Sequence, residues 1–202
     1  MCEKTTVFVV DDDPAARESV AAVIESRGMH VEAYASAEDF LDNFDRRRLG
    51  CLVTDIKMGG MSGLDLQEKL RTEEVALPVI VITGYGNVSA AMKAMRAGAV
   101  TMLEKPCRSE DLWRSISDAV DRHRETRQKQ TRLDELHRRL DRLTPDEREV
   151  MEQIKVGIPN KVIASRLDVG LRTVELRRSR VMKKMEADSL PELIQMLMEL
   201  EP

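Results

Sequence analysis

Five short apolar runs alternate with helix-like segments in the first half of the sequence, and this alternation restricts the fold more than any other feature of the chain. Strands joined by helices favour a parallel sheet whose two faces are both covered. We therefore expect an α/β domain over residues 1–123, with a doubly wound, five-stranded parallel sheet. The expected strands are 6–10, 31–34, 51–54, 78–82 and 101–103, and the expected helices are 14–27, 37–44, 64–71, 88–97 and 110–123.

The segment that follows is densely charged and contains no Gly or Pro between residues 122 and 142. Leu133, Leu136, Leu140 and Leu143 are spaced three, four and three residues apart, which is typical of one face of a helix. The pattern is shorter than the three or four heptads that would identify a coiled coil. Residues 124–143 are therefore interpreted as a helical linker, and a dimerising helix and a solvated helix remain equally open.

A second domain begins at Thr144, where Thr144, Pro145 and Glu147 form the signature of a helix start with a capping box. The rest of the chain has a helical pattern throughout, with expected helices at 145–156, 160–167, 171–185 and 189–199. Only three residues, 168–170, separate the second of these helices from the third, which predicts a helix-turn-helix. We expect residues 144–202 to form a small all-α domain of this type.

The charge of the chain is unevenly distributed. Residues 160–184 contain eight Lys or Arg against Asp168 and Glu175, a local balance of +6 in a chain whose net charge is −4. This segment is suited to a polyanion. The sequence contains no run of about 20 apolar residues that would span a membrane. Cys2, Cys51 and Cys107 do not form a disulfide or zinc pattern, so we expect a cytoplasmic protein.

Three acidic residues, one threonine and one lysine lie at the points where the expected strands end. Asp11 and Asp12 follow the first strand, Asp55 follows the third, Thr83 follows the fourth and Lys105 follows the fifth. Ligands of parallel sheets bind at the carboxyl ends of strands, and crowded carboxylates favour Mg²⁺. One carboxylate would attack a phosphoryl donor while Thr83 and Lys105 hold the transferred oxygens. Each Asp alone is also explained as a turn former, but the joint arrangement is not.

The motifs around these residues resemble those of a receiver domain over about residues 4–123. The matching segments are 9–13, 55–58 with 61–63, 81–84, 97–99 and 104–106. The resemblance implies a flavodoxin-like fold in which Asp55 is the phosphoacceptor. It also implies that Asp11, Asp12, Asp55 and the backbone carbonyl of Lys57 bind Mg²⁺. Thr83 and Lys105 would contact the phosphoryl group and couple it to the surface around the fourth helix and fifth strand, with Thr83 as a switch residue. A cis peptide is expected between Lys105 and Pro106.

Three positions depart from the receiver pattern. Gly59 stands where family members usually have Pro, which predicts a looser loop beside Asp55. Met102 stands where an aromatic residue usually swings inward on activation, and we expect this Met to exchange between two packings as a switch. Cys107 stands where Phe is common. Lys57 and Tyr85 are expected to tune the lifetime of the phosphoryl group by controlling the access of water.

The expected helix 171–185 has the two faces of a recognition helix. Leu171, Val174, Val181 and Met185 are assigned to the packed face. On the outward side Glu175, Leu176 and Ser179 are assigned to bases, and Lys161, Arg172, Thr173, Arg177, Arg178 and Lys184 to phosphates.

Residues of this part of the chain also resemble a LuxR-type DNA-binding domain over about 144–200. The matching segments are 143–145, 147–150, 160–161, 163–164 and 172–175, with Gly157 between them. Together with the receiver motifs and the segment 189–193, they are similar to the FixJ branch of response regulators. Asp168 and Gly170 replace the customary Gly and Ser of the turn, and Arg177 replaces a customary His.

These resemblances imply a transcription factor with four kinds of partner. A sensor histidine kinase phosphorylates Asp55, the receiver shifts and forms a homodimer, and the second domain binds double-stranded promoter DNA, with RNA polymerase as a further candidate partner. The receiver would control DNA binding either by dimerisation or by uncovering the second domain. Apart from its own phosphorylation and dephosphorylation chemistry, no enzymatic activity and no membrane partner are expected.

Two other functions compete with this interpretation. A small aspartate-dependent phosphatase would use Asp11 as its nucleophile and Asp13 as its partner, and it would turn over small phosphate esters. A constitutive DNA-binding protein with a degenerate receiver would use that domain only as a dimer scaffold. The presence of all five of Asp11, Asp12, Asp55, Thr83 and Lys105 argues against the second alternative.

Overall fold

The computed structural model describes residues 5–84 and 88–200 of the chain. The chain divides into two compact units, Met1–Arg127 and Gln128–Pro202. The first unit contains one five-stranded sheet in the order β2-β1-β3-β4-β5, in which all neighbouring strands are parallel. This topology confirms the expected doubly wound α/β fold. Its strands are β1 (Thr6–Val10), β2 (His30–Tyr34), β3 (Gly50–Asp55), β4 (Val79–Thr83) and β5 (Thr101–Glu104).

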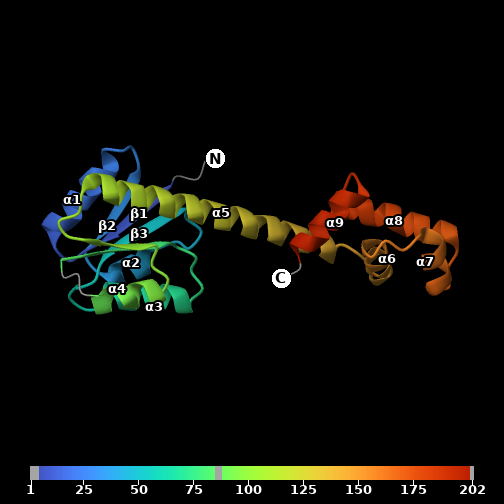
Figure 1. Ribbon diagram of the computed structural model, residues 1–202, viewed down its shortest axis with the longest axis horizontal. Coiled ribbons are helices and arrows are strands. Elements are labelled where there is room, and N and C mark those ends of the chain that lie inside the picture. The colour runs from blue at the N-terminus through green and yellow to red at the C-terminus, as the bar shows by residue number, and fades with distance from the viewer. Residues whose placement is uncertain (1–4, 85–87, 201–202) are drawn as a thin grey trace. The chain divides into compact units, whose positions relative to one another are not determined.

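Helices cover both faces of this sheet (Figure 1). Because successive strand residues point to opposite faces, Val7 and Val9 of β1 enter one core and Phe8 enters the other. The first core is completed by α1 (Pro14–Glu25) and α5 (Ser109–Asp141). The second is completed by α2 (Ala37–Asn43), α3 (Gly63–Thr72) and α4 (Val88–Arg96). The three central strands β1, β3 and β4 are thus buried on both sides, as expected for a parallel sheet, whereas the edge strands β2 and β5 are mostly half-buried.

The last helix of the first unit is much longer than the expected 110–123. α5 is one helix of 33 residues, Ser109–Asp141, because the segment contains no Gly or Pro to interrupt it. Its C-terminal part lies in the second unit, where Leu136 is completely buried and Leu143, just after the helix, is 6% exposed. The second compact unit thus begins at Gln128, within the segment 124–143 that the sequence analysis interprets as a helical linker.

Burial in the core of its own chain explains the leucine spacing of this segment. Leu136 and Leu143 belong to the same core as Val150 and Ile154 of α6 (Pro145–Lys155), and Leu140 packs against that core. The positions of Leu136 and Leu143 are therefore explained by packing within one chain, without a solvated helix or a dimer interface.

The second unit is wholly helical. α6 begins with the expected capping box, in which the Thr144 side chain accepts a hydrogen bond from the Glu147 N–H and the Glu147 carboxylate accepts one from the Thr144 N–H. α7 (Asn160–Arg166) and α8 (Leu171–Met185) are joined by the short turn of the expected helix-turn-helix, and α9 (Leu190–Glu199) completes the unit. Asp168 in that turn has a φ of 51°, a left-handed conformation that Asp tolerates better than most residues.

Truncation of Leu136 tests the assignment of this residue to the second core. We expect Leu136→Ala to destabilise the second unit by about 2–5 kcal/mol, because it leaves a cavity in a packed core. In denaturant titrations the loss of helical circular dichroism should move to lower denaturant concentration. The fluorescence of Trp113, the one tryptophan of the chain and a residue of the first unit, should keep its midpoint.

The matched control is Leu133→Ala, which removes a half-buried leucine from the preceding turn of the same helix. Its effect should be clearly smaller. Equal small effects of both substitutions would contradict the packing of Leu136 described above.

Candidate functional site

The register of the parallel strands brings the predicted site residues to one edge of the sheet. This edge is called the acidic edge below, and its residues are Asp11, Asp12, Asp55, Thr83 and Lys105. Val10 of β1 pairs with Thr54 of β3, so Asp11 and Asp55 follow at the same level. Asp11, Asp55 and Thr83 are buried to between 2% and 9% exposure, whereas Asp12 is exposed and Lys105 is half-buried. These residues converge because parallel strands all end at the same edge.

The ammonium group of Lys105 lies between two of the carboxylates. Its Nζ is 2.6 Å from Asp11 Oδ2 and 3.3 Å from Asp55 Oδ1. Partial burial lowers the pKa of Lys105, but the hydrogen bond to Asp11 and the charges of Asp11 and Asp55 outweigh this effect and raise it overall. Lys105 is therefore a protonated cation that offsets the repulsion between two buried carboxylates.

Backbone N–H groups fix the remaining oxygens of these two carboxylates. The Asp13 N–H donates to Asp11 Oδ1 at 3.0 Å, and the Lys57 N–H donates to Asp55 Oδ2 at 3.0 Å. Each of the two buried side chains is thus held by one cation and one backbone donor. The geometry orients Asp55 at the end of β3, next to the loop that begins with Ile56.

Two hydrogen bonds from the backbone connect the loop after Asp55, where Gly59 predicts a looser loop, to other parts of the chain. The Gly59 N–H donates to Asp12 Oδ2 at 2.9 Å, and the Met61 N–H donates to Glu38 Oε1 at 2.9 Å. The second of these bonds lowers the pKa of Glu38. Two carboxylates from other parts of the chain therefore restrain the loop through its backbone.

Glu38 is a site residue that the sequence reasoning missed. Its signal in the sequence is an acidic residue in the first turn of α2, and the helix dipole explains such a residue equally well. The contact with Met61 spans 23 residues and depends on the packing of α2 beside the loop. Tyr85, the other residue expected to control water access besides Lys57, lies outside the described residues.

The donor set has the chemistry that a hard divalent cation prefers. Asp11, Asp12 and Asp55 supply carboxylate oxygens at one edge of the sheet, as Mg²⁺ requires. Within residues 5–84 and 88–200, no group of three or more His, Cys, Asp or Glu side chains is close enough to hold one ion directly. Binding of one ion by all three carboxylates would therefore require side chains of this set to move.

The residues expected to relay the switch have different surroundings. Met102 on β5 is half-buried and packs against the core that contains Phe8 and Val81. Cys107 is half-buried against the opposite core. The peptide bond between Lys105 and Pro106 is cis, as expected.

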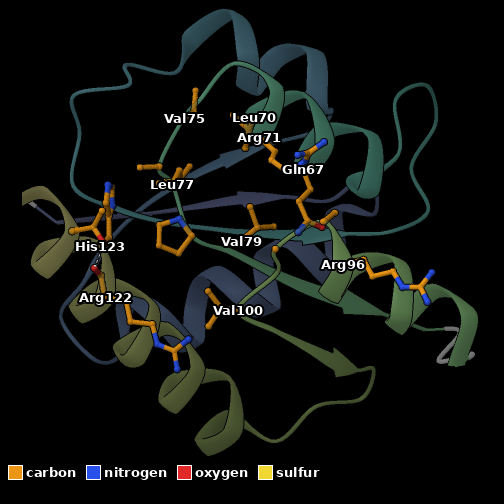
Figure 2. A pocket seen from close by; sticks show the side chains of 15 residues that line it. Gln67, Leu70, Arg71, Val75, Leu77, Val79, Arg96, Val100, Arg122 and His123 are labelled. Carbon is orange, nitrogen blue, oxygen red and sulfur yellow. Dashed lines mark hydrogen bonds between the residues drawn. The ribbon is translucent and has the colours of Figure 1, made fainter. Parts of the chain in front are cut away.

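A separate hollow lies at the opposite, amino edge of the sheet (Figure 2). Its volume is about 390 Å³, and Leu77, Val79 and Val100 form part of its wall near the starts of β4 and β5. Figure 2 shows the side chains of Arg96 and Arg122 extending from α4 and α5 at its rim. None of the predicted phosphorylation-site residues lines this hollow, so the chemistry of the acidic edge does not extend to it.

The predicted recognition helix α8 exposes the side that was assigned to DNA. Val174, Val181 and Met185 are buried, as expected, but Leu171 is 43% exposed and does not belong to the packed face. Leu171 is the first residue of the helix. The exposed residues assigned to DNA on α7 and α8 are Lys161, Arg172, Thr173, Glu175, Leu176 and Ser179.

Three cations assigned to phosphates are engaged within the protein. Arg177 forms an ion pair with Asp146, and Arg178 donates from Nη1 to Asn160 Oδ1 at 3.0 Å. Lys184 donates to Glu147 Oε2 at 2.6 Å and to the Arg142 carbonyl at 2.9 Å. These bonds join α8 to α6, to α7 and to the end of α5, so the three side chains help to assemble the helical unit.

Glu147 is the buried centre of this assembly. It is 2% exposed, and besides Lys184 it accepts the Thr144 N–H at 2.9 Å. Burial raises the pKa of Glu147, but the hydrogen bonds from Lys184 and from the Thr144 backbone outweigh it and lower the pKa overall. We therefore assign Lys184 a structural role rather than the phosphate contact that the sequence suggested.

Two known domain families match the chain. The response regulator receiver domain matches residues 7–117, and the luxR family of bacterial regulatory proteins matches residues 141–197. The transcriptional regulatory protein FixJ of Bradyrhizobium diazoefficiens is 35% identical over 98% of this chain and 97% of that protein. FixJ of Azorhizobium caulinodans is 41% identical over 97% of this chain and 93% of that protein.

A solved structure agrees with these sequence matches. The response regulator StyR has 35% sequence identity and a TM-score of 0.92, and the match covers 97% of this chain and 99% of that one. In the part of the chain that is described, we find no helix with both the length and the apolar character needed to cross a membrane.

Substitution of Glu147 tests its role in joining α6 to α8. We expect Glu147→Gln to lower the free energy of unfolding near pH 7 by about 1.5–3 kcal/mol, because a hydrogen-bonded charge pair is lost. Since the folded-state pKa of Glu147 is lowered, its contribution is complete above the unfolded value of about 4.3 and disappears as the pH falls through the folded value. The difference between the two proteins should therefore shrink on acidification.

Denaturant titrations at several pH values, followed by circular dichroism, measure this difference. Glu149→Gln, which removes an exposed carboxylate from the same helix, is the control and should change the free energy of unfolding by less than about 0.5 kcal/mol. A penalty for Glu147→Gln that grows toward acidic pH would contradict the assignment.

Proposed function

The chain belongs to the response regulator family, with a receiver domain followed by a luxR-family DNA-binding domain, and we propose that phosphorylation of Asp55 controls its binding to promoter DNA. A receiver implies a histidine kinase as partner, and a luxR-type domain implies DNA. The chain is a transcription regulator similar to FixJ, and this domain combination is not that of a classical enzyme.

The position of Asp55 is the observation that carries the proposal. Its carboxylate lies at the end of β3 with Lys105 Nζ 3.3 Å from Oδ1 and the Lys57 N–H on Oδ2. These donors would hold the carboxylate while one of its oxygens attacks the phosphorus of a kinase phosphohistidine. The P–N bond breaks, its electron pair leaves with the imidazole, and an aspartyl phosphate is formed.

The remaining residues of the acidic edge would support this transfer. Receiver domains generally bind Mg²⁺ for phosphorylation, and we assign Asp11, Asp12, Asp55 and the Lys57 carbonyl as its protein ligands. Lys105 and Thr83 would contact the transferred phosphoryl oxygens, since both lie at the same edge of the sheet. Lys105 would then weaken its contact with Asp11 and form a new one with a negatively charged phosphoryl oxygen.

A phosphatase with Asp11 as nucleophile is less well supported. Asp11 is 4% exposed, and both of its carboxylate oxygens already accept hydrogen bonds, from Lys105 and from the Asp13 N–H. Asp55 is also held by Lys105 and a backbone N–H, but it is 9% exposed and its oxygen lies 3.3 Å from Lys105 Nζ, against 2.6 Å for Asp11. Asp55 is therefore the less tightly held carboxylate and the better candidate nucleophile in this site.

Phosphorylation would act through the elements that follow the site. Thr83 ends β4 and Met102 lies on the neighbouring strand β5, half-buried, so a movement of Thr83 toward the phosphoryl group would alter the packing of Met102. We propose that this shift promotes a homodimer through the α4 face, that the dimer binds promoter DNA in the cytoplasm, and that RNA polymerase is a further partner. Two copies would match the two half-sites of an operator.

The exposed residues of α7 and α8 would make the DNA contacts. Glu175, Leu176 and Ser179 would reach base edges, and Lys161, Arg172 and Thr173 would contact phosphates. Arg177 and Arg178 are held by Asp146 and Asn160, so their phosphate contacts would require exchange of those partners.

Phosphorylation of the full chain tests the receiver assignment. Incubation with Mg²⁺ and phosphoramidate should add one phosphoryl group to Asp55, located by mass spectrometry, and should increase the sedimentation coefficient and the affinity for promoter DNA. Asp55→Asn should show none of the three changes, because it lacks the nucleophilic carboxylate. A rise in DNA affinity that persists in Asp55→Asn would contradict the proposal and favour a degenerate receiver.

Salt dependence tests the phosphate contacts. Lys161→Ala and Arg172→Ala should each weaken binding to specific and nonspecific duplexes alike and should reduce the slope of log affinity against log salt by about 1. Lys129→Ala, which removes an exposed cation from α5 of the same unit, should leave the slope unchanged. The assignment fails if the Lys129 variant loses as much of the slope as the other two.

A further inference from the structure

The backbone N–H of Gly59 links the two sides of the proposed metal site. It donates to Asp12 Oδ2 at 2.9 Å, so it connects the segment after β1 with the loop after β3. That loop also contains Lys57, whose carbonyl is the proposed fourth ligand. We infer that Gly59 is a positioning residue, whose N–H orients the Asp12 carboxylate for Mg²⁺; this inference rests on the proposed receiver function.

Asp12 needs such support more than the other two carboxylates. Asp11 and Asp55 are buried and share Lys105, whereas Asp12 is exposed. Within the described ranges 5–84 and 88–200, Gly59 supplies the hydrogen bond that orients the Asp12 carboxylate, and Oδ1 accepts none. One oxygen is therefore held while the other is left to bind a cation. A hydrogen bond from the protein to a metal ligand fixes the orientation of that ligand, and less side-chain entropy is then lost when the metal binds.

The residue type at position 59 decides whether this bond exists. The receiver resemblance places Pro at this position in most members, and Pro has no N–H to donate. The departure to Gly therefore supplies a donor that a proline cannot. A glycine pair, Gly59 and Gly60, would otherwise leave the loop flexible.

A second carboxylate supports the same loop from the other side. Glu38 Oε1 accepts the Met61 N–H, and Gly60 has a φ of 96°, a conformation that suits glycine. A Cβ at Gly60 would lie 3.0 Å from Glu38 Oε1, so the Glu38 side chain would have to shift slightly to accept any other residue there. The two hydrogen bonds, at Gly59 and at Met61, hold the loop that carries Lys57.

Two substitutions of Gly59 separate the loss of the N–H from the loss of glycine. A Cβ at this position would meet Asp12 Oδ2 at 3.9 Å, an ordinary contact, so Gly59→Ala fits and keeps the donor. Gly59→Pro removes the donor and installs the residue that is usual in the family. In calorimetric titrations with Mg²⁺, Gly59→Pro should bind about tenfold more weakly than Gly59→Ala, which should resemble the unsubstituted protein.

The possible outcomes are distinct. Equal dissociation constants for the two variants would overturn the inference alone, and tighter binding by Gly59→Pro would show that the N–H competes with the metal. If the unsubstituted chain does not bind Mg²⁺ at millimolar concentrations, the proposed site itself fails, and the inference fails with it. Thermal unfolding without Mg²⁺ identifies any variant that does not fold.

A measurement on the unsubstituted chain decides the same question without a substitution. The bond to Asp12 should slow the hydrogen exchange of the Gly59 amide, and this protection should persist throughout a Mg²⁺ titration, because the bond is retained when the metal binds. Loss of exchange protection on saturation with Mg²⁺ would overturn the inference.

Discussion

The parallel pairing of β1 with β3, and of β3 with β4, is the constraint on which the functional edge depends. Gly50, which pairs with Thr6 at the start of β3, has no room for a side chain, because a Cβ there would lie 1.7 Å from the Thr6 carbonyl oxygen. This register therefore requires glycine at position 50, and it carries Asp11 and Asp55 to the same level five residues later. The position of the acidic edge thus depends on the pairing of Thr6 with Gly50 at the start of the strands as well as on the residues at their ends.

Opposite charges are used in different ways in the two units. In the first, Lys105 bridges two carboxylates, and in the function proposed above a phosphoryl group or a cation would compete for the same interactions. In the second, the buried Glu147 holds Lys184 in a fixed link between α6 and α8. A basic helix face therefore overstates the number of cations that are available to DNA, because some of them hold the domain together.

The long helix α5 contributes one stretch to the core of each unit. Its first part packs through Leu112 and Ile116 against the sheet, and a later turn places Leu136 in the core of the helical unit. An uninterrupted run without Gly or Pro makes this possible, since each unit buries one stretch of the same helix.

The sequence by itself determined the α/β fold, the helix-turn-helix and the capping box at Thr144, because hydrophobic periodicity and helix caps are local patterns. It also indicated which carboxylates meet, since parallel strands end at one edge. Only the tertiary structure decided that Leu136 is core, that Lys184 binds Glu147, and that Asp12 and Glu38 fasten the loop at Gly59 and Met61. These contacts join residues that are 23 to 47 positions apart or depend on burial by several helices, and such distances are fixed by packing rather than by local sequence.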